Sequence, residues 1–173
     1  LVSKLERSFT TSHRGMHDRL EHEHGSRWSG SMAGGIMKKI GIKWKAEHMP
    51  SQVGKTVIVT GANTGIGYHM VKALASKGAN VIMACRNLGK ANTARTEILQ
   101  AVPEASIVVE ELDLADLANI ESFGQRITKS HGHIDTLINN AGVMIPPQST
   151  TVDGFELQIG TNHFGHFALT SHL

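Results

Sequence analysis

A glycine-rich stretch that follows a run of β-branched residues constrains the fold of this chain more than any other feature. The run is TVIVT at residues 56–60, and the stretch is TGANTGIG at residues 60–67. β-Branched residues favour a strand, and the apolar residues that recur at helical spacing from Ile66 to Leu74 favour a helix. Glycines also occur in ordinary turns. Between a strand and a helix, however, this motif is typical of a loop that holds phosphates.

Each glycine of the loop has a physical role in that context. Gly61 permits the sharp turn out of the strand, Gly65 lets the backbone approach a pyrophosphate, and Gly67 allows the helix to pack closely on the strand. The free N–H groups at the helix start face the phosphates, and the helix dipole strengthens the attraction. We therefore predict that a dinucleotide binds at Gly61, Asn63, Thr64, Gly65, Ile66 and Gly67.

Strand and helix patterns alternate along the rest of the chain. Further strands are predicted at residues 81–85, 107–112 and 134–138, and further helices at residues 91–99, 117–127 and 155–167. This alternation predicts βαβ units and a doubly wound α/β fold around a parallel sheet. We expect the strand order 3-2-1-4, with the cofactor in the crevice beside strands 1 and 4, where the order reverses.

The end of the second predicted strand favours NADP over NAD. A carboxylate at this place binds the ribose 2′-hydroxyl of NAD and repels a 2′-phosphate, but this chain has Cys85 followed by Arg86. A guanidinium pairs with a 2′-phosphate through charge-assisted hydrogen bonds. The alternative is that Arg86 is a solvated surface cation. We expect NADP(H) to be preferred over NAD(H).

Four motifs in order along the chain resemble those of the short-chain dehydrogenase/reductase family. They are TGxxxGxG at 60–67, LDL at 112–114, NNAG at 139–142 and NHFGHF at 162–167. The last motif and MACRN at 83–87 most resemble the retinol-dehydrogenase-like branch. The resemblance covers about residues 46–173. It implies a Rossmann-type sheet and hydride transfer between NADP(H) and an alcohol or carbonyl, with the protein positioning the nicotinamide.

The resemblance also implies roles for particular residues. Asp113 matches the aspartate that contacts the adenine ring; the alternative is that it caps the helix that begins near Asp116. Asn162 matches the active-site asparagine that organises a water near the catalytic lysine; the alternative is a buried helical asparagine that bonds to nearby backbone. The segment 139–142 matches the one that ends the fourth strand beside the cofactor; the alternative is that its short amide side chains satisfy backbone groups at the strand end. The further cofactor-binding residues predicted in this way are Arg86, Asn87, Asp113, Leu114, Asn140, Ala141 and Gly142.

The family's catalytic serine and Tyr-x-x-x-Lys pair follow the last motif, whereas this sequence ends at Leu173. In the family the tyrosine is the general acid or base, and proton transfer of this kind contributes ~10²–10⁴ in rate. Tyr68 and Lys72 match the Tyr-x-x-x-Lys spacing, but they lie in the helix after the glycine loop, so we interpret them as surface or packing residues. Asn162 is then the one active-site residue of this chain, and we expect the chain alone to be inactive.

The N-terminal segment differs in amino-acid composition from the rest of the chain. Residues 1–36 are rich in Ser, Gly, His and charge, which predicts a disordered extension; residues 37–52 are a lead-in, and 53–173 form the NADP-binding domain, incomplete at its C-terminus. Met37 is a candidate initiator. The His-rich spacing here allows a metal site as the alternative to a solvated tail. At the later pair, His163 and His166, the alternative to a metal site is packing within the fold. We expect no metal site. The four histidines of the extension are His13, His17, His22 and His24.

Composition narrows the class of protein. Residues 1–50 hold nine Lys/Arg and five Asp/Glu, whereas residues 51–173 hold eight and ten. The basic charge therefore lies outside the predicted domain, which argues against nucleic-acid binding. Cys85 is the single cysteine, so no intramolecular disulfide can form. Neither a stretch of ~18 apolar residues nor a secretory signal is evident, and we expect a soluble, cytoplasmic protein without a transmembrane segment.

Three functional hypotheses remain open. The chain is the cofactor-binding half of an oxidoreductase whose complete form acts on a small alcohol or carbonyl and forms a homo-oligomer. Alternatively, it is a dinucleotide-binding module without turnover, or an NADPH-sensing protein that acts through a partner. A fourth strand left as a long apolar edge would favour aggregation, so we expect poor stability of the isolated chain.

Overall fold

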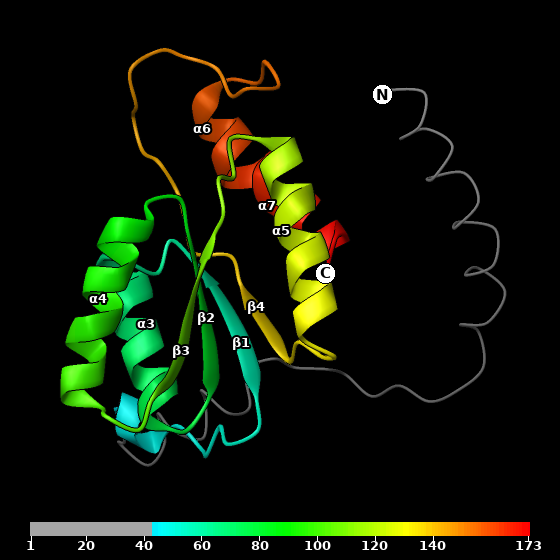
Figure 1. The fold of residues 1–173 in the computed structure, drawn as a ribbon. Helices are drawn as coiled ribbons and strands as arrows, with labels where there is room; N and C mark the ends of the chain where they lie inside the picture. The colour runs from blue at the N-terminus through cyan, green and yellow to red at the C-terminus, as the bar shows by residue number, and fades with distance from the viewer. Residues whose placement is uncertain (1–42) are drawn as a thin grey trace, which may run out of the picture. The chain divides into compact units, whose positions relative to one another are not determined.

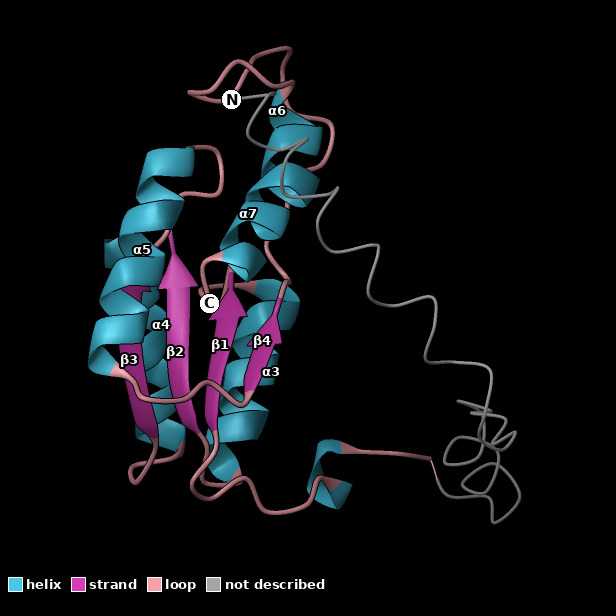
Figure 2. Ribbon diagram, turned by 90° about the vertical axis from the view of Figure 1, so that its right-hand side faces the viewer, coloured by secondary structure: helices cyan, strands magenta, loops and turns pink. Residues whose placement is uncertain are grey.

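Four parallel strands form one sheet in the order β3-β2-β1-β4, which confirms the predicted order. The computed structural model describes residues 43–173. Figure 2 shows all four arrows pointing the same way. The strands are β1 (Thr56–Thr60), β2 (Asn80–Cys85), β3 (Ser106–Glu111) and β4 (Thr136–Ile138). In the register of the sheet, Val57 of β1 lies between Val81 of β2 and Thr136 of β4.

Helices cover both faces of the sheet (Figure 1). They are α3 (Gly65–Ser76), α4 (Leu88–Ala101), α5 (Leu117–Ser130), the single-turn α6 (Leu157–Ile159) and α7 (His166–Ser171), with a 3₁₀ turn η1 (Ala46–His48) and a π-helical segment η2 (Gly160–Gly165). One core cluster joins α3 and α4 to the sheet, and a second joins α5 and α7 to its other face.

Strand β1 is buried on both sides, as its continuous apolar run predicts. Val57 and Val59 lie in the core cluster under α3 and α4. Ile58 points to the other face and lies in the cluster with Phe123 of α5 and Leu169 of α7. Strand β1 therefore carries its last residue, Thr60, into the middle of the fold, where the glycine loop begins.

Two predicted elements differ from those observed. The predicted fourth strand is shorter in the structure and runs from Thr136 to Ile138, so β4 is an edge of the described sheet but a short one. The helix predicted at 155–167 is three segments: α6, η2 and α7. The apolar spacing of this region was read at the α-helical period, and a single π-helical turn changes that period locally.

Two hydrogen bonds tie the lead-in to Lys77, at the end of α3. Residues Lys45–Leu173 fall in one compact unit. The N–H of Gln52 donates to the carbonyl of Lys77 over 2.8 Å, and the Lys77 ammonium donates to the carbonyl of Glu47 over 2.8 Å. The predicted extension at 1–36, its four histidines and Met37 lie outside the described residues, so the predicted domain boundaries stay predictions.

Nothing in residues 43–173 has both the length and the apolar character of a membrane-spanning helix.

Helix α5 begins at a side-chain cap, which allows a stability prediction. The Asp116 carboxylate accepts hydrogen bonds from the N–H groups of Ala118 and Asn119 at 2.9 and 3.2 Å. We expect Asp116→Ala to lower the free energy of unfolding by ~1 kcal/mol, because those N–H groups lose their acceptor. Asp116→Asn, which keeps an acceptor oxygen, is the matched control. Urea denaturation measures both, and equal midpoints for Asp116→Ala and the unsubstituted protein would contradict the prediction.

Candidate functional site

A cleft of about 500 Å³ lies where the strand order reverses, at the carboxyl ends of the strands. Every residue predicted to bind the cofactor lines this cleft except Gly65, which lies between the lining residues Thr64 and Ile66. Sequence reasoning missed five lining residues: Ala84, Lys90, Leu112, Val143 and Thr161. The arrangement brings the predicted residues together, and their binding roles stay predictions.

The glycine loop leaves the start of α3 open. Gly61 and Gly65 adopt positive φ values of 63° and 56°, a region that disfavours residues with a Cβ. Thr64 occupies the N-cap position, but its side chain makes no capping hydrogen bond. The first N–H groups of α3 therefore have no side-chain acceptor from the cap and are available to an anion.

Close packing explains two of the loop glycines. A Cβ at Gly61 would lie 2.8 Å from the Cα of Ala141, and one at Gly67 would lie 2.6 Å from the carbonyl oxygen of Gly61 and 2.6 Å from the Asn140 amide nitrogen. A Cβ at Gly65 would meet nothing within 4 Å. Gly61 and Gly67 therefore let the loop pack on the end of β4, whereas Gly65 faces open space.

Asn140 joins the ends of β1 and β4. Its side-chain amide donates to the carbonyl of Thr60 over 2.8 Å, and its backbone N–H donates to the Thr60 hydroxyl over 2.9 Å. The N–H of Ala141 donates to the same hydroxyl over 2.9 Å. The structural role that the sequence left open for this amide is thus present, and it places Asn140 and Ala141 at the wall of the cleft.

Two cations lie at the end of the cleft next to β2. Arg86 directly follows β2, its side chain is exposed, and within residues 43–173 it forms no ion pair. Lys90, on the first turn of α4, lines the same cleft. The side chain of Asn87 accepts a hydrogen bond from the N–H of Lys90 at 2.9 Å and so caps α4. The sequence signal for Lys90 is its place three residues after Asn87, which puts it in the first turn of α4.

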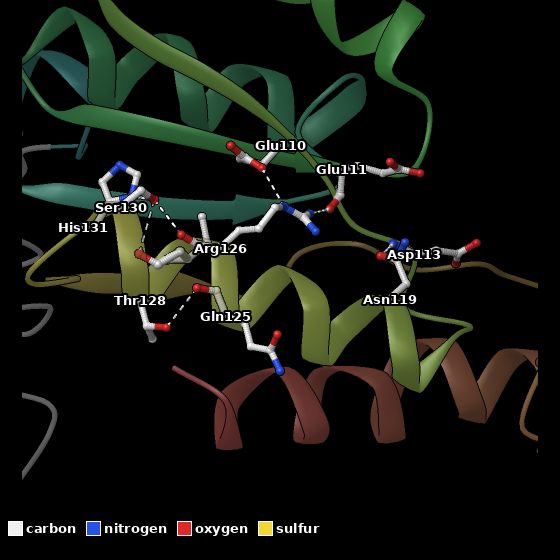
Figure 3. A network of polar contacts seen from close by, with 10 residues as sticks. Glu110, Glu111, Asp113, Asn119, Gln125, Arg126, Thr128, Ser130 and His131 are labelled. Atoms are coloured by element: carbon white, nitrogen blue, oxygen red, sulfur yellow. Dashed lines mark hydrogen bonds and ion pairs between the residues drawn. The ribbon is translucent and has the colours of Figure 1, made fainter.

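Asp113 does not cap α5, because Asp116 does. Instead its Oδ1 accepts from the N–H of Ala115 at 2.9 Å, and its own N–H donates to the side chain of Asn119 at 2.8 Å. Figure 3 shows this turn beside Arg126, which joins α5 to the carbonyl of Glu111 at the end of β3. The turn holds the half-buried Asp113 at the rim of the cleft.

Asn162 is exposed and bonds to backbone nineteen residues away along the chain, so the alternative of a buried, locally satisfied asparagine is wrong. Its Oδ1 accepts from the N–H of Val143, and its Nδ2 donates to the carbonyl of Val143, each at 2.8 Å. This pair of bonds joins η2 to the segment that follows β4. Asn162 itself does not line the cleft, whereas its neighbour Thr161 does.

The other residues that the sequence singled out lie in the core or on the surface, away from any catalytic arrangement within the described residues. Tyr68 packs partly buried against the core under α3, while Lys72 is exposed on the same helix. Burial raises the pKa of the Cys85 thiol, which keeps it protonated at neutral pH. His163 is exposed beside the ring of Phe164, whereas His166 is buried and bonds to Thr60. The described residues bring no three potential metal ligands together.

A family model described as short chain dehydrogenase matches residues 55–173, which is most of the sequence. The chain belongs to this family. Relatives include mouse retinol dehydrogenase 11, 50% identical over 117 residues, and human retinol dehydrogenase 13, 49% identical over 118 residues. Each match covers 68% of this chain but only 37% and 36% of the relative, so the chain spans little more than a third of their length.

Solved structures agree with this assignment. A crystal structure of an uncharacterized protein from Mycobacterium paratuberculosis has a TM-score of 0.68 at 45% identity, over 76% of this chain and 46% of that one. A metagenomic short-chain oxidoreductase in complex with NADP has a TM-score of 0.62 at 27% identity, over 70% of this chain and 56% of that one. The predicted Rossmann-type α/β fold and the predicted retinol-dehydrogenase-like resemblance are both confirmed.

Proposed function

We propose that this chain is the NADP(H)-binding part of an oxidoreductase that transfers hydride between NADP(H) and an alcohol or carbonyl substrate. The observation that carries the proposal is the cleft itself, in which an open helix start, two cations and a polar strand end face the same space. In the reaction an alcohol loses a hydride to NADP⁺ and a proton to a base, and a carbonyl compound, NADPH and H⁺ result. Because relatives are named retinol dehydrogenases, retinol is the first alcohol to test.

The groups that line the cleft fit the parts of an NADP molecule. The first N–H groups of α3 suit the pyrophosphate, and Arg86 with Lys90 suits a 2′-phosphate. Asp113 keeps one carboxylate oxygen without a bond to the described residues, which suits an amino donor such as that of adenine. NADP supplies the hydride acceptor when bound, and this chain's residues bind and orient it.

Titration with NADPH and NADH tests the proposal. We expect saturable binding of NADPH and weaker binding of NADH by about 10- to 100-fold, because hydrogen bonds to a charged group contribute ~1.5–3 kcal/mol. Calorimetry or nicotinamide fluorescence measures both constants. Equal affinities would contradict the preference for NADP, and no binding of either nucleotide to folded protein would contradict the whole proposal.

The 173 residues alone are expected to bind the cofactor without turning over. Tyr68 is the single tyrosine in the sequence; it belongs to α3 and packs against the core there, whereas Asn162 lies on η2. We expect no NADPH formation above background from NADP⁺ and an alcohol, followed at the absorbance of the reduced nicotinamide. Tyr68→Phe is the matched control. If the 173 residues do turn over, and Tyr68→Phe abolishes that turnover, then both the expected inactivity and the interpretation of Tyr68 as a packing residue are wrong.

A further inference from the structure

The Thr60 hydroxyl is the centre of a buried hydrogen-bond cluster at the end of β1. It accepts from the N–H groups of Asn140 and Ala141, each at 2.9 Å, and lies 2.9 Å from Nε2 of His166. Its distance to the carbonyl oxygen of Ile138 is longer, 3.3 Å. Thr60 is fully buried and His166 is 6% exposed. In such surroundings each donor needs an acceptor, because an unpaired buried polar group costs free energy.

Counting protons across the cluster fixes the state of the imidazole. Nδ1 of His166 lies 3.0 Å from the backbone carbonyl oxygen of Asn162, which can only accept, so Nδ1 carries the proton. In the neutral ring Nε2 is then an acceptor. Both lone pairs of the Thr60 oxygen are occupied by N–H groups, so its hydroxyl can only donate, and Nε2 at 2.9 Å is a nearer acceptor than the Ile138 carbonyl at 3.3 Å. Every group in the cluster has a partner only when His166 is the neutral Nδ1–H tautomer.

The cluster connects three parts of the cleft. Asn140 and Ala141 line it at the end of β4, and Thr60 leads into the glycine loop. Asn162, whose carbonyl accepts from His166, holds Val143 with its side chain. One imidazole ring thus bonds to the end of β1 and to η2 at the same time.

We propose that His166 is a positioning residue of the cofactor site, which in its neutral form holds the ends of β1 and β4 and the segment η2 in the geometry that binds NADP(H). The expected effect on NADP(H) binding rests on the proposed function, whereas the assigned tautomer of His166 does not. When the ring gains a second proton, Nε2–H meets a Thr60 oxygen whose lone pairs are already occupied. One N–H of the cluster then loses its acceptor, and the strand ends lose their common anchor.

The charged groups of the surrounding elements do not face this ring. Helix α5 carries exposed Glu121, Arg126 and Lys129, and β1 and β4 are flanked by Lys55 and Asp135 at their opposite ends. Asp113 bonds to the Ala115 N–H before α5, Asp116 bonds to the first N–H groups of α5, and His163 and His172 are exposed. Burial lowers the pKa of His166 and the bond to the Asn162 carbonyl raises it, with burial the larger cause.

The sign of the pH effect follows from that direction. Because the pKa of His166 is lower in the folded protein than its ordinary value of ~6.5, the unfolded chain takes up the proton first as pH falls. The folded state therefore keeps its full stability above about pH 6.5 and loses stability below it, down to the folded pKa. We expect the affinity for NADPH to fall at lower pH, where the folded ring itself takes up the proton, below the ordinary value of ~6.5.

The test combines ring-nitrogen NMR with NADPH titration between about pH 5 and 8, on the protein in its natural length. Long-range ¹H–¹⁵N spectra are expected to show His166 protonated at Nδ1 and bare at Nε2.

His166→Leu removes both bonds and should weaken NADPH binding about tenfold or more near pH 8, and flatten its pH profile. His166→Gln keeps an acceptor for the Thr60 hydroxyl and should restore most of the affinity. His69→Gln, an exposed histidine on α3, is the control and should match the unsubstituted protein.

Each outcome decides a separate point. A ring protonated at Nε2 near pH 8 overturns the inference, as does a His166→Leu protein with unchanged affinity and pH profile. If His166→Leu does not fold, three other measurements test the inference. They are the tautomer of His166, the pH profile of NADPH binding by the unsubstituted protein, and the NADPH affinity of His166→Gln. No NADPH binding by the unsubstituted protein at any pH overturns the proposed function, while the tautomer still decides the geometry of the cluster.

Discussion

Gly65→Ala is expected to weaken NADPH binding substantially while the protein remains folded. Gly65 has a φ of 56°, and a Cβ at this position would meet nothing within 4 Å of the chain. The substitution therefore costs only the strain of a left-handed backbone, ~1–2 kcal/mol. We expect the new methyl group to crowd the pyrophosphate that we propose binds at the start of α3, because the second glycine of such a loop lets the backbone approach the phosphates. We expect the dissociation constant for NADPH to rise about tenfold or more, or ~1.4 kcal/mol.

Gly54→Ala is the matched control for this prediction. Gly54 has a φ of 78° and also has open space around a Cβ, but it lies before β1 and does not line the cleft. Both substitutions should lower the melting temperature by a similar amount, and only Gly65→Ala should weaken the binding of NADPH. Equal NADPH affinity for the two variants would mean that the glycine loop is an ordinary turn.

Gly67→Ala separates packing from binding in the same loop. Its φ is not positive, but a Cβ there would lie 2.6 Å from the backbone oxygen of Gly61. The backbone must shift to admit it, so this variant should lose stability beyond the strain cost that Gly65→Ala carries. Thermal unfolding of the three glycine variants then ranks Gly67→Ala lowest.

Local sequence was sufficient for the fold because the elements that position the site are short and regular. The buried run of β1, the turn at Gly61 and the alternation of strands with helices leave one sheet order that places Gly61 beside Ala141. A parallel sheet with right-handed crossovers permits few alternatives. The glycine-loop residues of the cleft were predictable for the same reason. The others came from the family resemblance, and five lining residues were missed.

What the sequence did not predict depends on contacts between distant residues. The bond between Thr60 and His166 joins positions 106 residues apart, and no local pattern specifies it. Asn162 bonds to Val143 from the π-helical segment η2, and an apolar pattern at the α-helical period does not show such a segment. Both aspartates suit a helix cap by residue type, and only the backbone geometry makes Asp116, not Asp113, the cap of α5.

The choice between NADP and NAD is expected to depend on Arg86, and this is the second large effect. Arg86 is exposed at the end of β2, and within the described part of the chain no carboxylate pairs with it. Replacing it by aspartate removes a partner for a 2′-phosphate and adds a repulsive charge at the place where a carboxylate binds the ribose hydroxyl of NAD.

We therefore expect Arg86→Asp to weaken NADPH by about 10- to 100-fold, or ~1.5–3 kcal/mol, while NADH binds no more weakly than before. Lys72→Asp changes the net charge equally on the exposed face of α3, outside the cleft, and is the matched control. Titrations at low and high salt separate the two effects, because a long-range charge effect is screened beyond about 10 Å at 0.1 M salt. If Lys72→Asp weakens NADPH as much as Arg86→Asp does, then the preference comes from net charge. If only Arg86→Asp does so and Lys90→Gln weakens NADPH by a smaller factor, then the two cations bind the 2′-phosphate together.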